Sequence, residues 1–125
     1  MPQLSGTVLI VDDDAAVRGA LKFALETEGL VVRLYDGPEA LLADPALPPR
    51  SCLVIDYRMP TMDGIELIEA LRLRHVTLPT IMITGRANQS LRSRAAVSGV
   101  REVLEKPLSD GALVDNIRSI FAAGG

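Results

Sequence analysis

The stretch VLIVDDD, residues 8–14, decides the fold, and a second apolar run, CLVI at 52–55, ends in the same way in Asp56. A short apolar run rich in β-branched residues is typical of a strand buried on both faces, as in a parallel sheet. If the two strands are parallel neighbours, their carboxyl ends lie at one edge, which is where open α/β folds bind ligands. We therefore expect Asp12, Asp13 and Asp56 to meet in one crevice.

These clustered carboxylates predict a metal site. Carboxylates a few ångströms apart repel each other by roughly 4 kcal/mol per pair at an effective dielectric of ~20. A cation between them removes this repulsion, and a hard divalent ion with oxygen ligands, such as Mg²⁺, suits three carboxylates. The sequence thus predicts Mg²⁺ as the cofactor, bound by Asp12, Asp13 and Asp56.

Strand-like and helix-like patterns alternate five times along the chain. Strands are expected at 7–11, 30–35, 51–55, 80–84 and 101–104. Repeated βα units imply a parallel sheet with helices on both faces, because the crossovers between parallel strands are right-handed. The predicted fold class is therefore α/β, with a doubly wound five-stranded parallel sheet flanked by five helices.

Helix ends are marked by capping residues. Asp14 is expected to cap the first helix and Gly29 to follow it, Asp63 to cap the third, and Ser109 the last. Shorter helical patterns occupy 39–43 and 89–98. The expected inner faces consist of Val17, Leu21, Ala24 and Leu25 in the first helix, Ile65, Ile68 and Leu71 in the third, and Leu113, Ile117, Ile120 and Phe121 in the last.

Composition narrows the functional class. The 125 residues fit one domain, and a net charge of −3 gives no sign of nucleic-acid binding. The chain has no apolar run of the ~20 residues that a membrane span needs, and its first residues lack the pattern of a signal peptide. Cys52 is the single cysteine of the chain, so an internal disulfide is excluded. It falls inside a predicted strand, which indicates a small buried side chain. A reducing cytoplasm is the expected compartment.

Two more polar groups fall at the same predicted edge. Thr84 ends the fourth strand, and Lys106 follows the fifth in a chain that has eleven arginines and two lysines. Lysine supplies a compact point charge that suits a phosphoryl oxygen. A nucleophilic carboxylate at Asp56, metal-binding carboxylates, a hydroxyl and an ammonium are the groups needed to accept a phosphoryl group. Taken singly, each has a simpler explanation as a cap, a turn residue or a surface ion pair.

Together these motifs resemble a response-regulator receiver domain of two-component signalling. The resemblance covers about residues 7–121 and rests on VLIVDDD at 8–14, VIDYRMP at 54–60 with MDG at 62–64, LPTIMITG at 78–85 and EKP at 105–107. Each motif is moderately specific, and all four in order are highly specific. The Thr84-Gly85 ending and the stretch after Gly64 look most like FixJ-type regulators, in which the receiver precedes a DNA-binding module.

The resemblance implies a flavodoxin-like (CheY-like) fold with strand order 2-1-3-4-5 and a role for each site residue. It implies that Asp56 is the phosphoacceptor, that Asp12 and Asp13 bind Mg²⁺ together with the backbone carbonyl of Arg58, that Thr84 is the switch hydroxyl and that Lys106 contacts the phosphoryl group. It further implies a cis peptide between Lys106 and Pro107. It implies as well that transfer and autodephosphorylation are self-catalysed, so that the protein is not expected to be a conventional enzyme.

One position departs from the family pattern. Many receivers carry an aromatic residue three positions before the conserved lysine, and here that position is Val103. A β-branched side chain cannot swing between buried and exposed positions as a ring does, so coupling to the output is expected to be muted. Arg58 and Arg86 flank the site, where they either steer anions and shield the phosphoryl group or are simply solvated.

The expected partners are a sensor histidine kinase and an output domain or partner protein, with transcription control as the output. Neither nucleic acid nor membrane is expected to bind this segment, and the protein is expected to be a monomer or a weak dimer through the fourth helix, fifth strand and fifth helix. Residues 1–125 are expected to form one receiver domain, either alone or as the N-terminal part of a longer regulator. A stand-alone regulator remains an alternative, as does a small aspartyl phosphatase, whose motif fits Asp12 and Asp14 but not the residues that follow.

Overall fold

The computed structural model of this chain describes residues 6–108 and 111–124, and it contains the predicted alternation of strands and helices. The strands are β1 Thr7–Val11, β2 Val31–Tyr35, β3 Ser51–Asp56, β4 Thr80–Thr84 and β5 Val100–Glu105. The helices are α1 Ala15–Thr27, α2 Pro38–Ala43, α3 Gly64–Leu73, α4 Gln89–Val97 and α5 Ala112–Gly124. None of the described helices combines the length and the apolar character that crossing a membrane requires.

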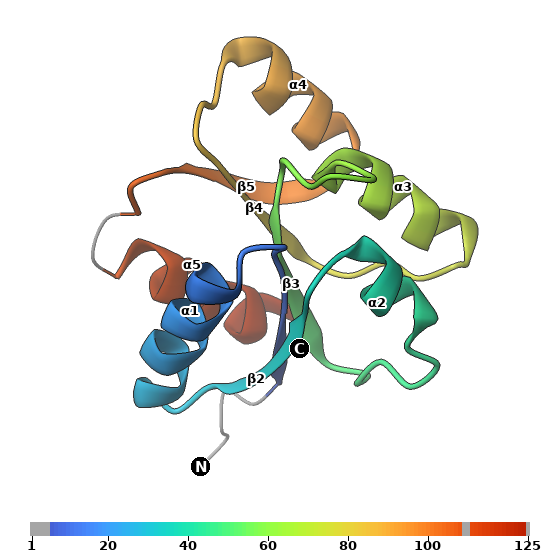
Figure 1. The fold of residues 1–125 in the computed structure, drawn as a ribbon. Helices are drawn as coiled ribbons and strands as arrows, with labels where there is room; N and C mark the ends of the chain where they lie inside the picture. Colours follow the sequence, from blue (N-terminus) through green and yellow to red (C-terminus); the bar gives the residue numbers. More distant parts are fainter. Residues whose placement is uncertain (1–5, 109–110, 125) are drawn as a thin grey trace.

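The five strands form one parallel sheet in the order β2-β1-β3-β4-β5, which confirms the predicted topology (Figure 1). The strand boundaries agree with the sequence pattern to within one residue at each end. β5 is longer than predicted, and its pairing with β4 shifts register between Thr80 and Ile81. In this order β3 lies next to β1, so the strand that ends in Asp56 is the direct neighbour of the strand that precedes Asp12.

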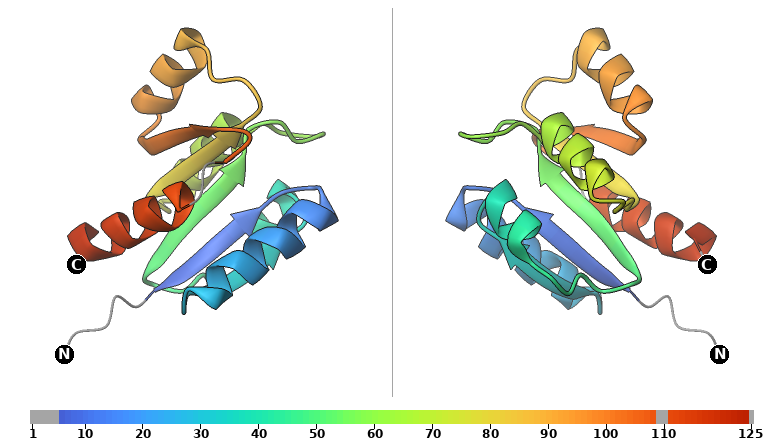
Figure 2. Two further views of the ribbon diagram at one scale, coloured as in Figure 1. Left: turned by 90° about the vertical axis from the view of Figure 1, so that its left-hand side faces the viewer. Right: turned by 90° about the vertical axis from the view of Figure 1, so that its right-hand side faces the viewer.

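Two apolar cores lie on the two faces of the sheet, because alternate side chains of each strand point to opposite faces. Figure 2 shows α1 and α5 on one face and α2 and α3 on the other. Leu25 of α1 and Ile117 of α5 pack against Ile10 and Val54. On the other face, Leu67 of α3 packs with buried residues of α2 and α4 and with the strand side chains that point to that face. The sheet is thus fixed on both faces, and its carboxyl edge carries the loops that form the site.

The helix ends confirm most of the predicted caps. The Asp14 carboxylate accepts the N–H groups of Ala16 and Val17, and Gly29 follows α1 with a φ of 85°. Asp63 accepts the N–H of Glu66 at 2.8 Å in a reciprocal capping box that starts α3. The predicted cap at Ser109 lies outside the described residues.

The predicted inner faces are confirmed for α5, whose four apolar residues are all buried. The prediction for α1 is wrong at Ala24, which is exposed, while Leu25 is buried and Leu21 half-buried. Helix α1 contacts β2 at the edge of the sheet, so a narrower stripe of the helix is covered than the periodicity suggests.

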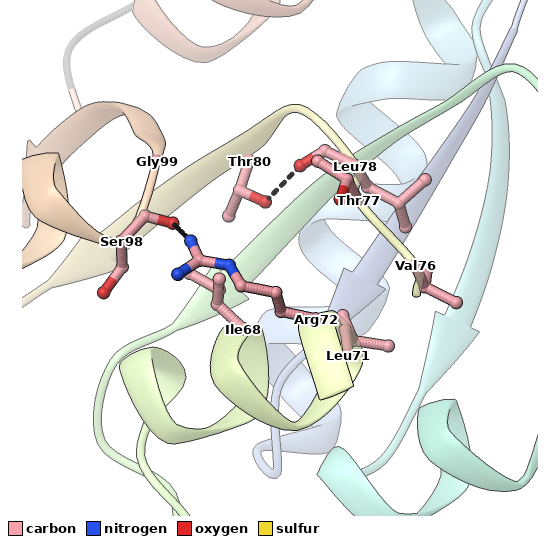
Figure 3. Close-up of a pocket in the computed structure, with 9 residues that line it drawn as sticks. All are labelled: Ile68, Leu71, Arg72, Val76, Thr77, Leu78, Thr80, Ser98 and Gly99. Atoms are coloured by element: carbon pink, nitrogen blue, oxygen red, sulfur yellow. Dashed lines mark hydrogen bonds between the residues drawn. The ribbon is translucent and has the colours of Figure 1, made fainter. Parts of the chain in front are cut away.

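A small cavity of about 80 Å³ lies at the opposite, amino-terminal edge of β4 (Figure 3). Its lining combines aliphatic and polar residues, and the Arg72 guanidinium reaches across it to donate a hydrogen bond of 2.8 Å to the Ser98 carbonyl. This contact ties the end of α3 to the turn between α4 and β5. The cavity is remote from the acidic residues and adds nothing to their chemistry.

Candidate functional site

The three acidic residues meet at the carboxyl edge of the sheet, as predicted. Val11 pairs with Ile55 across β1 and β3, so the next residues, Asp12 and Asp56, come out side by side. Asp12, Asp13 and Asp56 each offer a carboxylate oxygen, and these oxygens lie within 4.8 Å of one another. A cation that binds several oxygens at once fits this donor set.

Asp12 is the most buried member, with 4% of its surface exposed. Its Oδ1 accepts the N–H of Asp14 at 2.9 Å, and its backbone carbonyl accepts a hydrogen bond from the Arg18 guanidinium at 2.7 Å. Burial raises the pKa of Asp12, and the neighbouring carboxylate of Asp13 raises it further, while the hydrogen bond from Asp14 and the charge of Lys106 lower it. The apo site therefore holds negative charge at a cost in free energy.

Asp56 is oriented by an ion pair. The Lys106 ammonium lies 3.4 Å from Asp56 Oδ1, and the side chain of Asp56 is 11% exposed against 41% for that of Lys106. Burial is the largest cause that raises the pKa of Asp56, and Asp12 adds to it, while Lys106 partly offsets both. One Asp56 oxygen thus faces a cation, and the carboxylate remains within reach of the acidic pair.

Thr84 lies buried at the end of β4, close to the same edge. Its hydroxyl donates to the Arg86 carbonyl and accepts the Arg86 N–H, both at 3.3 Å. The Thr84 carbonyl accepts the N–H of Lys106 at 2.8 Å, which links the ends of β4 and β5. The peptide bond between Lys106 and Pro107 is cis, as the resemblance implied.

Asp14 takes no part in the acidic cluster, because its carboxylate caps α1. The arrangement that would support the phosphatase alternative, with Asp12 and Asp14 acting together, is therefore not formed.

Arg58 and Arg86 both line a cavity beside Thr84. Val103 lies on β5 and is 8% exposed, so it is part of the core. Cys52 is fully buried, as predicted, and burial raises the pKa of its thiol to about 12.

The structure adds contacts that the sequence pattern did not reveal. The Arg94 guanidinium of α4 donates a hydrogen bond of 3.3 Å to the hydroxyl of Tyr57, the residue that follows Asp56 in the chain. The Tyr57 carbonyl accepts the N–H of Gly64 at 2.9 Å, which closes the loop after β3. A Cβ atom at Gly64 would lie 3.0 Å from a Met82 side-chain atom, so the loop packs where only glycine fits without displacement. Contacts between distant loops carry no periodic signal that a sequence could show.

Comparison with known proteins identifies the family of this chain. Residues 8–118 match the family model described as "Response regulator receiver domain". The transcriptional regulatory protein FixJ of Bradyrhizobium diazoefficiens is 39% identical over 116 residues, covering 91% of this chain and 56% of that protein. The C4-dicarboxylate transport transcriptional regulatory protein DctR of Rhodobacter capsulatus is 36% identical, covering 96% of this chain and 62% of that protein.

Solved structures agree on the fold. The crystal structure titled FixJ-N superposes with a TM-score of 0.87 at 34% identity, covering 98% of this chain and 97% of that one. The Vibrio cholerae chemotaxis protein CheY4 shares the fold, with a TM-score of 0.82 at 22% identity.

The chain belongs to the response-regulator receiver family, whose members are the phosphoacceptors of two-component signalling. It spans little more than half the length of the curated relatives named above.

Proposed function

We propose that Asp56 accepts a phosphoryl group from a histidine kinase, with Mg²⁺ bound by Asp12, Asp13, Asp56 and the backbone carbonyl of Arg58. The observation that carries the proposal is the ion pair between Asp56 and Lys106 beside the two acidic residues. Three oxygens within 4.8 Å of one another suit a hard divalent ion. When bound, Mg²⁺ supplies positive charge to the phosphoryl oxygens.

The protein's own part in the transfer is positioning. An Asp56 oxygen forms a bond to phosphorus as the bond between phosphorus and the donor's histidine nitrogen breaks, and a later attack by water returns the carboxylate. Lys106 already lies 3.4 Å from Asp56 Oδ1, so its ammonium can move to a phosphoryl oxygen without leaving the site. No general base is needed for the forward step, because the nucleophile is an ionised carboxylate, and the departing imidazole of the donor takes up a proton from solvent.

Thr84 is the proposed switch hydroxyl. In the present state its hydroxyl is paired with the Arg86 backbone. If the Thr84 hydroxyl gave up these two hydrogen bonds to bind a phosphoryl oxygen, the loop that leads to α4 would move. The reason is that these hydrogen bonds connect the hydroxyl directly to the backbone of that loop.

The proposed partners follow from this role. A sensor histidine kinase donates the phosphoryl group, and an output domain or a partner protein in the cytoplasm receives the conformational change, with transcription control as the output. FixJ and DctR are named as transcriptional regulators, which supports that output. The proposed contact face consists of α4, β5 and α5, where an isolated domain would dimerise weakly.

Beryllofluoride, a mimic of the phosphoryl group, tests the roles of the site residues. With Mg²⁺ and beryllofluoride, we expect amide shifts in residues 85–97 of the wild-type protein and a much smaller response in Lys106→Ala. Lys22→Ala is the matched control, because Lys22 is the other lysine of the chain and is exposed on α1. A full response in Lys106→Ala would contradict the role given to this ammonium.

A further inference from the structure

The loop between β1 and α1 carries two of the three acidic residues, and hydrogen bonds around Asp12 hold its backbone. The Asp12 N–H donates to the Tyr35 carbonyl at 3.3 Å, which continues the pairing of β1 with β2. Asp12 Oδ1 accepts the N–H of Asp14 at 2.9 Å. A further bond comes from outside the loop, because the Arg18 guanidinium of α1 donates to the Asp12 carbonyl at 2.7 Å. Arg18 therefore helps to fix the point at which the chain leaves the sheet.

The Asp12 carbonyl needs a partner of this kind. Asp12 is 4% exposed, and β1 ends at the residue before it. A buried carbonyl without a hydrogen bond is costly, so a donor has to reach it from another part of the chain. The Arg18 N–H donates to the Asp14 carbonyl at 3.0 Å in the first turn of α1. The start of the helix that Asp14 caps thus places the guanidinium beside the loop.

The carbonyl that Arg18 holds belongs to the peptide unit that joins Asp12 to Asp13. A peptide unit is planar, so a fixed carbonyl also fixes the position from which the Asp13 side chain starts. Asp13 is exposed, so core packing does not hold this side chain. Its carboxylate nevertheless contributes to the group of oxygens that lie within 4.8 Å of one another. The orientation of this peptide unit therefore controls whether Asp12 and Asp13 present oxygens to the same cation.

The contacts of Arg18 indicate a geometric role rather than an electrostatic one. Arg18 belongs to none of the ion pairs of the described residues, whereas Lys106 is paired with Asp56. Lys106 is also a cation that lowers the pKa of Asp12. Because Arg18 donates to a neutral carbonyl, its hydrogen bond leaves the carboxylates free to bind a metal ion.

We propose that Arg18 is a positioning residue for the Mg²⁺ site, which holds the peptide unit between Asp12 and Asp13 so that both carboxylates face one cation. The inference rests on the proposed function, since it needs a cation bound by these two residues. Groups that orient metal ligands contribute roughly 10–100-fold to metal affinity. Arg18→Met keeps an unbranched stem and removes the donor, so it should weaken Mg²⁺ binding about tenfold. A role through charge would give the opposite sign, because a cation beside the site repels Mg²⁺ and its removal strengthens binding.

The test is a titration of the metal-free protein with MgCl₂ at constant ionic strength and without phosphodonor, followed by amide NMR. Lys22→Met is the matched control, because Lys22 is exposed about one turn further along α1 and its replacement removes the same charge. This variant should bind Mg²⁺ like the wild-type protein. Arg18→Lys keeps the charge and an N–H donor, so it should recover part of the affinity that Arg18→Met loses.

Amide hydrogen exchange in the metal-free protein locates the effect. Exchange at Asp14, whose N–H is bonded to Asp12, should be faster in Arg18→Met than in the wild-type protein. Exchange at Glu66, whose N–H is bonded to Asp63 in a similar way, should not change. A general loss of stability would accelerate exchange at both positions.

The outcomes separate this inference from the proposed function. If the wild-type protein binds Mg²⁺ and Arg18→Met binds it equally or more tightly, the positioning role is wrong and the metal site stands. An equal loss of affinity in Lys22→Met would likewise overturn the role of Arg18. If the wild-type protein binds no Mg²⁺, the proposed metal site is wrong, and the inference fails with it.

Discussion

Replacement of Asp12 by asparagine should stabilise the metal-free protein at neutral pH. Asp12 is 4% exposed, and its carboxylate shares a cluster of oxygens within 4.8 Å with Asp13 and Asp56. Two unit charges at this distance of 4.8 Å repel by about 3.5 kcal/mol at an effective dielectric of ~20. The variant removes two such pairs. Solvent around exposed Asp13 and the lost attraction to Lys106 reduce the gain, so we expect about 1–3 kcal/mol in the free energy of unfolding.

The pH dependence tests whether the gain comes from the negative charge of Asp12. Burial raises the pKa of Asp12 in the folded state above its ordinary value of 3.8. Between the two pKa values the folded protein binds more protons than the unfolded chain, so this residue's contribution to stability falls as the pH rises through that interval. The advantage of Asp12→Asn should thus be full above the folded-state pKa and should disappear near pH 3, where both states are protonated, about one unit below the ordinary aspartate value.

Urea unfolding in EDTA at a series of pH values measures this difference, with Asp36→Asn, an exposed residue just after β2, as control. Mg²⁺ at ten times its dissociation constant should then stabilise the wild-type protein by about 1.4 kcal/mol and the variant by less. If Asp12→Asn is less stable than wild type at pH 7 without metal, or if its advantage is the same at every pH, the buried negative charge of Asp12 is not what limits the stability of the metal-free protein.

Three further changes test other parts of the structure. Gly64→Ala should lower the free energy of unfolding by about 1–3 kcal/mol, because the added Cβ would meet the Met82 side chain. Gly19→Ala, on the open face of α1, is the control and should raise the free energy of unfolding by up to about 1 kcal/mol. Urea unfolding of both variants measures the difference. Cys52, fully buried with a thiol pKa of about 12, should react with a thiol reagent at pH 8 only after denaturant is added, and rapid labelling of the native protein would contradict its burial. Val103→Tyr should enlarge the amide-shift difference between the free and beryllofluoride-bound forms, and an unchanged difference would show that valine at this position does not attenuate the switch.

Much of the fold could be predicted because its elements have strong local patterns. The apolar runs that form β1, β3 and β4 are buried on both faces, so their sequences identify them without reference to the rest of the chain. The caps at Asp14 and Asp63 were predictable for the same reason, since each acts on residues within one turn. The prediction that Ala24 lies on the buried face was wrong, because periodicity gives the direction of a buried helix face and not its width.

The acidic cluster was predictable from strand ends alone, because parallel neighbours bring their carboxyl ends together. The ion pair between Asp56 and Lys106 was not predictable in this way, because it depends on how far the flexible lysine side chain reaches from the end of β5. The family resemblance implied only that Lys106 contacts the phosphoryl group. The hydrogen bond between exposed Arg94 and half-buried Tyr57 joins residues far apart in the sequence, and no pattern in the sequence predicts such a contact.

The most direct test of the central claim is the intact mass of the protein after incubation with acetyl phosphate and Mg²⁺. The account predicts a gain of one phosphoryl group in the wild-type protein, the loss of that gain when EDTA replaces Mg²⁺, and no gain in Asp56→Asn. Asp36→Asn should be labelled like wild type. Labelling of Asp56→Asn to the wild-type extent would show that Asp56 is not the acceptor.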